Sequence, residues 1–177
     1  MFLSKFLVKH KYEKETFYQA ADVDRKDTVF NRKTINDSTI AACNRLTKKS
    51  DYGERMELLS EEEQIFYIAT EVECEVNNSG FERFLYERSG KFAGKAVEAL
   101  KAIGATNMAF FCEKALNAVG TEFPEDMEER VKILKEKITD DVREVFKECE
   151  SAFEGDPDDF NALVYNYLTE HSEKFTE

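Results

Sequence analysis

Residues that interrupt helices are scarce in this chain, and this scarcity limits its fold more than any other feature. Among 177 residues there are only 7 Gly and 2 Pro. Between them, apolar residues recur at steps of three and four, which places their side chains on one face of an α-helix. No segment alternates apolar and polar residues as a half-buried β-strand does. The sequence therefore predicts an all-α fold.

Start and stop signals divide the chain into helices. Ser60 and Glu63 form a capping box that begins a helix expected to end near Val76. An earlier helix is expected to begin at Asp37 or Ser38, either of which is a suitable N-cap. After Val76 the chain is expected to turn before a short helix that ends at a glycine.

The second half of the chain shows a more regular pattern. Two apolar stripes of similar length end at Gly104 and Gly120 and predict an αα-hairpin. A helix over 126–153 follows, with an expected bend near Thr139, and the last helix is expected over 157–172. With 15 Phe to fill a core, the chain is predicted to form one domain, a bundle of roughly seven to nine helices built from antiparallel αα-hairpins.

The N-terminal part of the chain differs from the rest in its charge and in its expected structure. Residues 1–36 are predicted to form a helix or arm that packs on the core, and residues 37–177 to form the all-α domain. Residues 1–60 carry 12 Lys+Arg against 9 Asp+Glu, whereas residues 61–177 carry 13 against 28, for a net charge of −12 in total. Such a field repels nucleic acid and anionic membranes and attracts basic surfaces, although it also serves solubility. We expect no direct nucleic-acid binding.

The motifs that would indicate a cofactor, a metal or an enzyme are missing from the sequence. There is no glycine-rich phosphate loop and no Cys-x-x-Cys pair, so no cofactor, metal site or catalytic residue is predicted. No apolar stretch reaches the length of a membrane span, and we expect a reducing cytoplasm. The four cysteines are instead expected to be small core residues: Cys43, Cys74, Cys112 and Cys149.

Acidic residues gather toward the C-terminus and are the candidate partner-binding surface. No Lys or Arg lies between Lys147 and Lys174. One acid per helical turn is too sparse to imitate a nucleic-acid backbone, so mimicry would need acids from neighbouring helices or from two subunits. The candidates are Glu122, Glu125, Asp126, Glu128, Glu129, Glu148, Glu150, Glu154, Asp156, Asp158 and Asp159.

A second candidate site is the corner at residues 71–81. Glu71 and Glu75 lie four residues apart on one helical face, a spacing that would allow acid–base or metal chemistry. The favoured interpretation is that they form a solvated face or that one of them bonds the backbone of the turn, because no His or third acid accompanies them. Asn77 and Asn78 are expected to bond nearby backbone groups, and Gly80 to permit the turn before Phe81.

The residues of this corner also carry a family resemblance. The pattern Glu73-x-Glu75-Val76-Asn77-Asn78-x-Gly80-Phe81, followed by Ile103-Gly104-Ala105, resembles a bacterial family of unknown function (the DUF4375 type) whose best-known member is an acidic, dimeric DNA mimic. The resemblance covers residues 58–120, and the family has Gly where this chain has Ser79. It implies an all-α fold and admits a homodimer. It also implies binding to a basic DNA-binding protein in place of DNA.

The leading hypothesis is therefore a non-enzymatic acidic interaction module, with DNA mimicry toward a transcription-factor-like protein as its specific form. One alternative is a small enzyme or a metal- or ligand-binding protein that uses the Glu71–Glu75 pair beside the corner. Another is an immunity-type binding module. Because mimicry depends on surface charge rather than on the fold-forming corner, the acidic helices are the more informative candidates.

Overall fold

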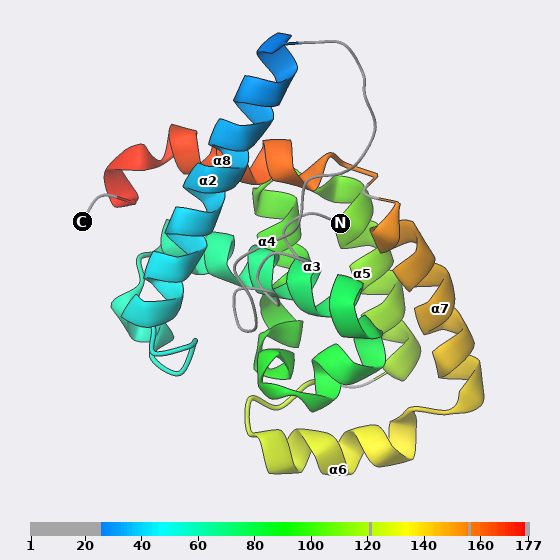
Figure 1. Ribbon diagram of the computed structural model, residues 1–177. Coiled ribbons are helices and arrows are strands. Elements are labelled where there is room, and N and C mark those ends of the chain that lie inside the picture. The colour runs from blue at the N-terminus through cyan, green and yellow to red at the C-terminus, as the bar shows by residue number, and fades with distance from the viewer. Residues whose placement is uncertain (1–25, 121, 156, 176–177) are drawn as a thin grey trace.

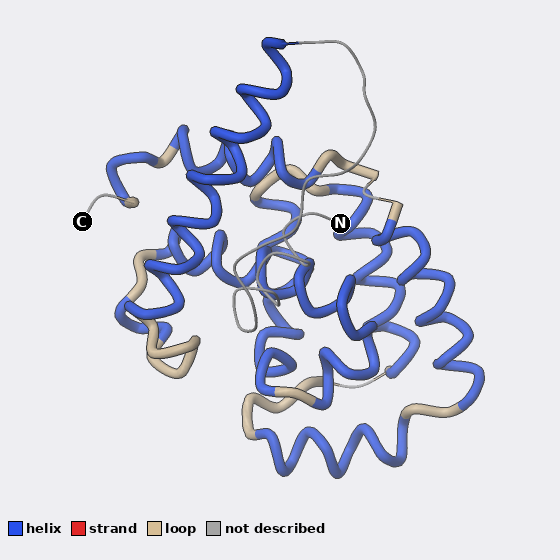
Figure 2. Tube along the Cα trace, viewed as in Figure 1, coloured by secondary structure: helices blue, strands red, loops and turns tan. Residues whose placement is uncertain are grey.

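The computed structural model describes residues 26–120, 122–155 and 157–175, and these residues form helices joined by loops without a β-strand (Figures 1 and 2). The all-α prediction is confirmed. The described α-helices are α2 (Lys26–Lys49), α3 (Glu61–Tyr86), α4 (Ala93–Ala102), α5 (Thr106–Val119), α6 (Met127–Lys137), α7 (Asp140–Glu154) and α8 (Phe160–Glu170). Three short 3₁₀ turns accompany them: η1 (Met56–Leu58), η2 (Arg88–Phe92) and η3 (Ser172–Lys174).

Helix α3 is the centre of the bundle. It contacts α2, α4, α6, α7 and α8, while α5 packs between α4 and α7. Helices α2 and α8 cross each other at one end of the molecule, and α6 lies at the opposite end (Figure 1). The core is rich in phenylalanine, and Phe66, Phe81 and Phe84 of α3 are fully buried. No helix in the described ranges is long and apolar enough to cross a membrane.

The start of α3 confirms the predicted capping box. The Ser60 hydroxyl accepts from the Glu63 amide at 3.3 Å, and the Glu63 carboxylate accepts from the Ser60 amide at 2.9 Å. The expected end near Val76 is wrong, because helical backbone continues through residue 79. Only Gly80, at φ 81° and ψ 169°, leaves the helical region, and α3 then resumes to Tyr86.

The predicted αα-hairpin is confirmed in α4 and α5. They are joined by residues 103–105 and pack against each other. The helix expected over 126–153 is instead two helices, since the chain is extended at Ile138 and Thr139. The Thr139 hydroxyl accepts from the Val142 amide at 3.4 Å and so caps α7, at the position where the bend was expected.

Two expected helix starts are wrong. Helix α2 begins at Lys26 and passes through Asp37 and Ser38, which therefore cap nothing. Helix α8 begins at Phe160 rather than at residue 157, because the Asp158 carboxylate is bonded to α5 and Asp159 adopts a left-handed backbone. Residues 1–25 lie outside the described ranges, so the N-terminal helix or arm and the boundary at residue 36 stay predictions.

Candidate functional site

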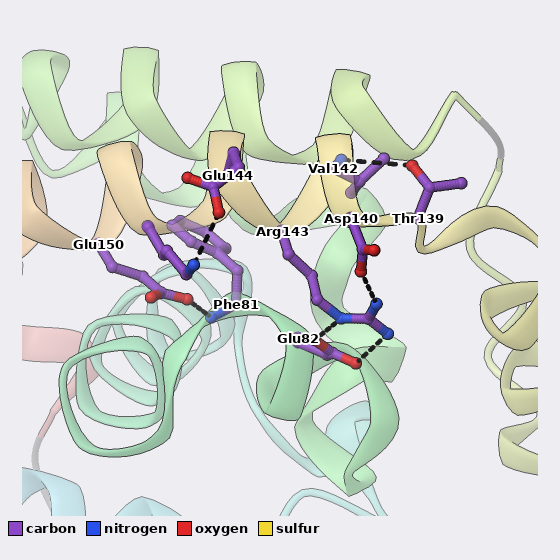
Figure 3. Close-up of polar contacts among 9 residues, drawn as sticks. Phe81, Glu82, Thr139, Asp140, Val142, Arg143, Glu144 and Glu150 are labelled. Atoms are coloured by element: carbon purple, nitrogen blue, oxygen red, sulfur yellow. Dashed lines mark hydrogen bonds and ion pairs between the residues drawn. The ribbon is translucent and has the colours of Figure 1, made fainter.

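The corner of α3 is closed by a glutamate from α7. Because Gly80 is not helical, Phe81 begins a new helical segment, and its amide has no acceptor within that segment. Oε1 of Glu150 accepts from this amide at 2.8 Å (Figure 3). A Cβ at Gly80 would lie 2.5 Å from the same oxygen, and Gly80 also has a positive φ. The glycine is therefore required both for the turn and for the approach of Glu150.

A second polar contact and a pair of aromatic contacts fix α7 to the same segment. The Arg143 guanidinium donates to both carboxylate oxygens of Glu82, at 2.9 and 3.2 Å, in the two-bond geometry favoured by arginine (Figure 3). Beneath these polar contacts, the Phe81 ring packs edge-on against Phe153 at 5.2 Å and tilted against Phe146 at 5.9 Å. The corner is thus a packed junction between α3 and α7.

The two asparagines support the helix rather than the turn. The side-chain amide of Asn78 donates to the Cys74 carbonyl at 2.6 Å, which confirms the expected bond to nearby backbone. The side-chain amide of Asn77 instead donates to the Glu73 carboxylate at 2.8 Å. Both bonds reach back four residues along α3, which explains why the helix continues past Val76.

Glu73 is the buried carboxylate of this region, and it was not predicted as a site residue from the sequence. It is 1% exposed, while Glu71 and Glu75 are half-buried. The signal for its burial was present, because Glu73 lies four residues after Ala69 and three before Val76, on the apolar stripe of α3. Glu71, Glu73 and Glu75 all have interaction partners. In the described part of the chain, no cluster of three or more His, Cys, Asp or Glu could hold a metal ion.

The predicted core role of the cysteines is confirmed. All four are buried free thiols. Burial raises the pKa of Cys43 to about 12, and burial followed by the nearby carboxylate of Glu71 raises the pKa of Cys74. Since the thiolate is the reactive form, these positions are unsuited to nucleophilic or redox chemistry.

The acids at the start of α6 lie at the surface. Asp126 caps the helix by accepting from the Glu129 amide at 2.8 Å, and the dipole of α6 favours further acids in this first turn. The Glu125 carboxylate lies 4.0 Å from the Lys95 ammonium, a loose exposed pair. We call this exposed set the α6 acids: Glu122, Glu125, Asp126, Glu128 and Glu129.

Helix α7 carries an exposed row of three acids. Of these, only Glu148 was among the candidate residues predicted from the sequence. Asp141, Glu144 and Glu148 are spaced by three and four residues and all are exposed, and we call them the α7 acid row. The spacing could have revealed the two acids that were passed over. Glu144 pairs with Lys147 at 2.7 Å and Glu148 with Lys114 of α5 at 2.6 Å, whereas no ion pair among the described residues involves Asp141.

The remaining candidate acids fall into separate places. Glu150 holds the corner, as described above. Asp158 accepts from the Met108 amide at 2.7 Å and from the Asn107 side chain at 2.8 Å, so it caps the start of α5. Glu154 and Asp159 are exposed. Asp156 lies outside the described residues.

Charge divides the molecular surface by helix. Residues 93–119, which form α4 and α5, carry three Lys+Arg and two Asp+Glu. Residues 122–159 carry six Lys+Arg and 15 Asp+Glu, a net charge of −9. The α6 acids and the α7 acid row lie on helices that run in different directions and meet at residues 138–139 (Figure 1).

The fold and this charge distribution define an acidic, all-α protein whose carboxylates are displayed on outer helices. Comparison with protein families matches residues 57–171 to the DMP19-like protein family, and the chain belongs to this family. No curated protein and no solved structure matches the chain. The match extends the resemblance of residues 58–120 through α8. Membership implies a protein of the DNA-mimic type.

Proposed function

We propose that this protein is a non-enzymatic DNA mimic that occupies the basic, DNA-contacting surface of a transcription-factor-like protein. The observation that carries the proposal is the net charge of −9 over residues 122–159, displayed as the α6 acids and the α7 acid row. A basic protein surface is the complement of such a field. Glu150 and Asp158 are expected to contribute less to binding because they accept from backbone amides of α3 and α5. The lysine pairs of Glu144 and Glu148 lie at the surface, where ion pairs are weak and can be exchanged for a partner's cations.

The spacing of the acids sets a requirement on mimicry. A helix rises about 5.4 Å per turn, so the α7 acid row supplies about one charge per turn, whereas duplex DNA has one phosphate per ~1.7 Å of axis. Helix α6 runs in a different direction from α7 and does not double the row (Figure 1). A second copy of the chain would bring a second row alongside the first, which supports mimicry by a dimer.

The homodimer is proposed to form through the outer face of α4 and α5. Two copies with a charge of −12 repel each other, so their contact is favoured where charge is balanced. Lys101 and Glu113 lie 3.8 Å apart on this face, and Phe110 of α5 is 60% exposed. An exposed aromatic ring within a balanced charge pattern suits a self-complementary contact.

The dimer is tested by the mass of the full chain in solution. Phe110→Glu is expected to shift the mass from dimer to monomer in light scattering, while Tyr52→Glu, which changes another exposed aromatic at 61%, leaves it unchanged. A wild-type chain that stays monomeric at about 100 μM, a concentration well above typical specific affinities, contradicts the proposed dimer.

The mimic is tested by binding. The immobilised full chain is exposed to cell extract at low salt, and a captured protein counts only if it binds duplex DNA itself and is released by added duplex. The triple variant Asp141→Asn, Glu144→Gln, Glu148→Gln is expected to lose most of this capture. The matched control Asp51→Asn, Glu54→Gln, Glu57→Gln removes three exposed acids outside the acidic helices and the proposed dimer face, and it is expected to keep the capture. Equal capture by both variants contradicts the proposal.

The alternative functions have less support from the same contacts. A carboxylate-pair enzyme needs Glu71 and Glu75 open to a ligand, but both are half-buried and already engaged with other groups. An immunity-type binding module would use the same acidic surface with a different partner. The release step separates these cases, because a partner that does not bind DNA is not displaced by duplex.

A further inference from the structure

A groove is lined by residues of α2, of α8 and of the segment that follows α8. Helices α2 and α8 cross at the end of the molecule opposite α6 (Figure 1). Its volume is ≈ 430 Å³, toward the lower end of the ~300–1,000 Å³ of small-molecule sites. Helix α2 contributes residues spaced as one helical stripe, and α8 and η3 contribute the opposite wall. The lining residues are Ser38, Ala41, Ala42, Arg45, Leu168, Ser172 and Phe175.

Arg45 is the charged group of this groove, and part of its guanidinium is unused. Its Nη1 donates to the Phe175 carbonyl, and its Cζ lies 6.0 Å from the centroid of the Phe175 ring. Its Nη2 is buried and has no hydrogen-bond partner within the described ranges. A buried donor without an acceptor costs free energy, and more so when the group is charged. Because Nη2 is enclosed by protein atoms, an acceptor from outside would remove this cost only if the guanidinium turned toward the groove.

The other arginines whose side chains are described do not share this condition. The exposed ones pair with carboxylates, as Arg55 does with Glu57 at 3.3 Å. The buried one, Arg130, donates to four backbone carbonyls. Among the described residues, no carboxylate contacts Arg45, and none of those that line the groove is acidic.

The walls of the groove determine what else a ligand must carry. Ala41, Ala42, Leu168 and the ring of Phe175 present apolar surface. Phe175 is itself held in place, since it is 7% exposed and packs edge-on against Phe66 at 5.3 Å. The groove is therefore partly preformed, with a cation beside an apolar wall.

We propose that this groove binds a small amphipathic monocarboxylate, with the carboxylate on the Arg45 guanidinium and the hydrocarbon or aromatic body against Leu168 and Phe175. A planar carboxylate matches the donors of a guanidinium. The hydroxyls of Ser38 and Ser172 offer further hydrogen bonds. The site is independent of the acidic surface and of the proposed mimicry.

The test uses 4-phenylbutyrate as the probe and its uncharged amide, 4-phenylbutyramide, as the matched ligand. Binding to the full chain is followed by ¹H–¹⁵N NMR titration. Saturable shifts are expected at α2 and α8 residues with the acid, and at least ~tenfold weaker binding with the amide, since a charged hydrogen bond is lost. No saturation by the acid up to about 10 mM, a Kd too weak for a specific site, overturns the proposal.

Variants assign the binding to the groove. Arg45→Gln is expected to weaken acid binding at least ~tenfold, while Arg55→Gln, an exposed arginine elsewhere, leaves it unchanged. Because Arg45→Gln also removes the bond to Phe175, a second variant is needed. Ala41→Leu fills the groove from an exposed position of α2 and is expected to reduce binding without lowering the melting temperature. Unchanged binding by both groove variants refutes the assignment.

Discussion

The α4–α5 hairpin and the α6–α7 segment are packed in the same way on the inside and differ on the outside. Each places buried apolar side chains against α3 or α5, such as Ala96 and Leu100 of α4 or Phe146 and Phe153 of α7. On the outside, the first carries balanced charge and the second a net −9. Folding depends on the inner faces, so the outer faces are free to differ and to carry function.

The acids of the α6–α7 segment also divide into acids that hold the fold and acids that lie at the surface. Some are exposed, as in the α7 acid row, while Glu150 and Asp158 are bonded to backbone amides of α3 and α5. Acidity of the sequence is therefore a poor guide to which carboxylates can meet a partner. The following predictions separate the residues that hold the fold from those on the surface.

The largest effect is expected for Phe153→Ala. This ring is fully buried in α7 against Phe81, and its truncation should lower the free energy of unfolding by ~3–5 kcal/mol. Phe110→Ala on α5 removes an exposed ring and should change the stability of the isolated chain by no more than ~0.5 kcal/mol. Urea denaturation of both variants measures the contrast. Similar losses would mean that Phe110 is not a surface residue.

Arg130→Met tests how α6 is attached. The side chain is 1% exposed and donates to the carbonyls of Leu85, Glu87, Pro124 and Glu125. Leaving these acceptors without their donor should cost ~2–4 kcal/mol. Hydrogen exchange should accelerate in α6 while α4 and α5 stay protected. Uniform acceleration across all helices would show instead that α6 is not a separable part of the fold.

Glu150→Ala tests the corner. Loss of the acceptor for the Phe81 amide should lower the free energy of unfolding by ~1–2 kcal/mol, as loss of a helix cap does. Glu150→Gln keeps an oxygen in place and should recover part of this loss. Glu148→Ala, two residues away and paired among the described residues with Lys114 alone, is the surface control. Chemical denaturation measures all three, and equal losses at positions 148 and 150 would exclude a specific cap.

The smallest effect is expected for Cys112, a buried residue of α5, the helix that packs against α7, and this effect depends on pH. Burial raises the pKa of Cys112, so this thiol stays protonated in the folded chain when the unfolded chain ionises above pH ~8.5. Its contribution to stability is therefore complete below pH ~8.5 and declines as the pH rises further.

Cys112→Ala should make this decline shallower by at most ~1.4 kcal/mol per pH unit, the limit for one group. Denaturation between pH 8 and 10 under reducing conditions provides the measurement, with Glu98→Gln on exposed α4 surface as the control. If the free energy of unfolding of the alanine variant falls with pH as steeply as that of the wild type, the prediction for Cys112 is wrong.

Much of the fold followed from local patterns. The Ser60–Glu63 capping box, the α4–α5 hairpin and the cap near Thr139 were predictable because each depends on residues within a few positions of one another. The end expected near Val76 was wrong because the bonds of Asn77 and Asn78 extend the helix. The start of α8 was wrong because Asp158 is recruited by α5, some 50 residues away in sequence.

The candidate site was less predictable, for a related reason. The sequence indicated where acids are dense, and the family match supports the class of protein. It did not distinguish an acid that caps a backbone amide from an acid in a surface ion pair, since Glu148 and Glu150 have the same local sequence context and differ only because α3 packs beside α7. The groove at Arg45 could not be predicted from the sequence either, because its lining residues come from α2 and from the C-terminal segment, which are far apart in the sequence.

By itself, the sequence determined that this chain is helical, acidic and rich in buried phenylalanine, because these properties depend on composition and short-range spacing. Only the tertiary structure decided which carboxylates are structural. The amide of Phe81 is left without an acceptor by the bend at Gly80, and the acceptor that reaches it comes from another helix. Such a requirement arises only when distant segments pack together, and no local pattern records it.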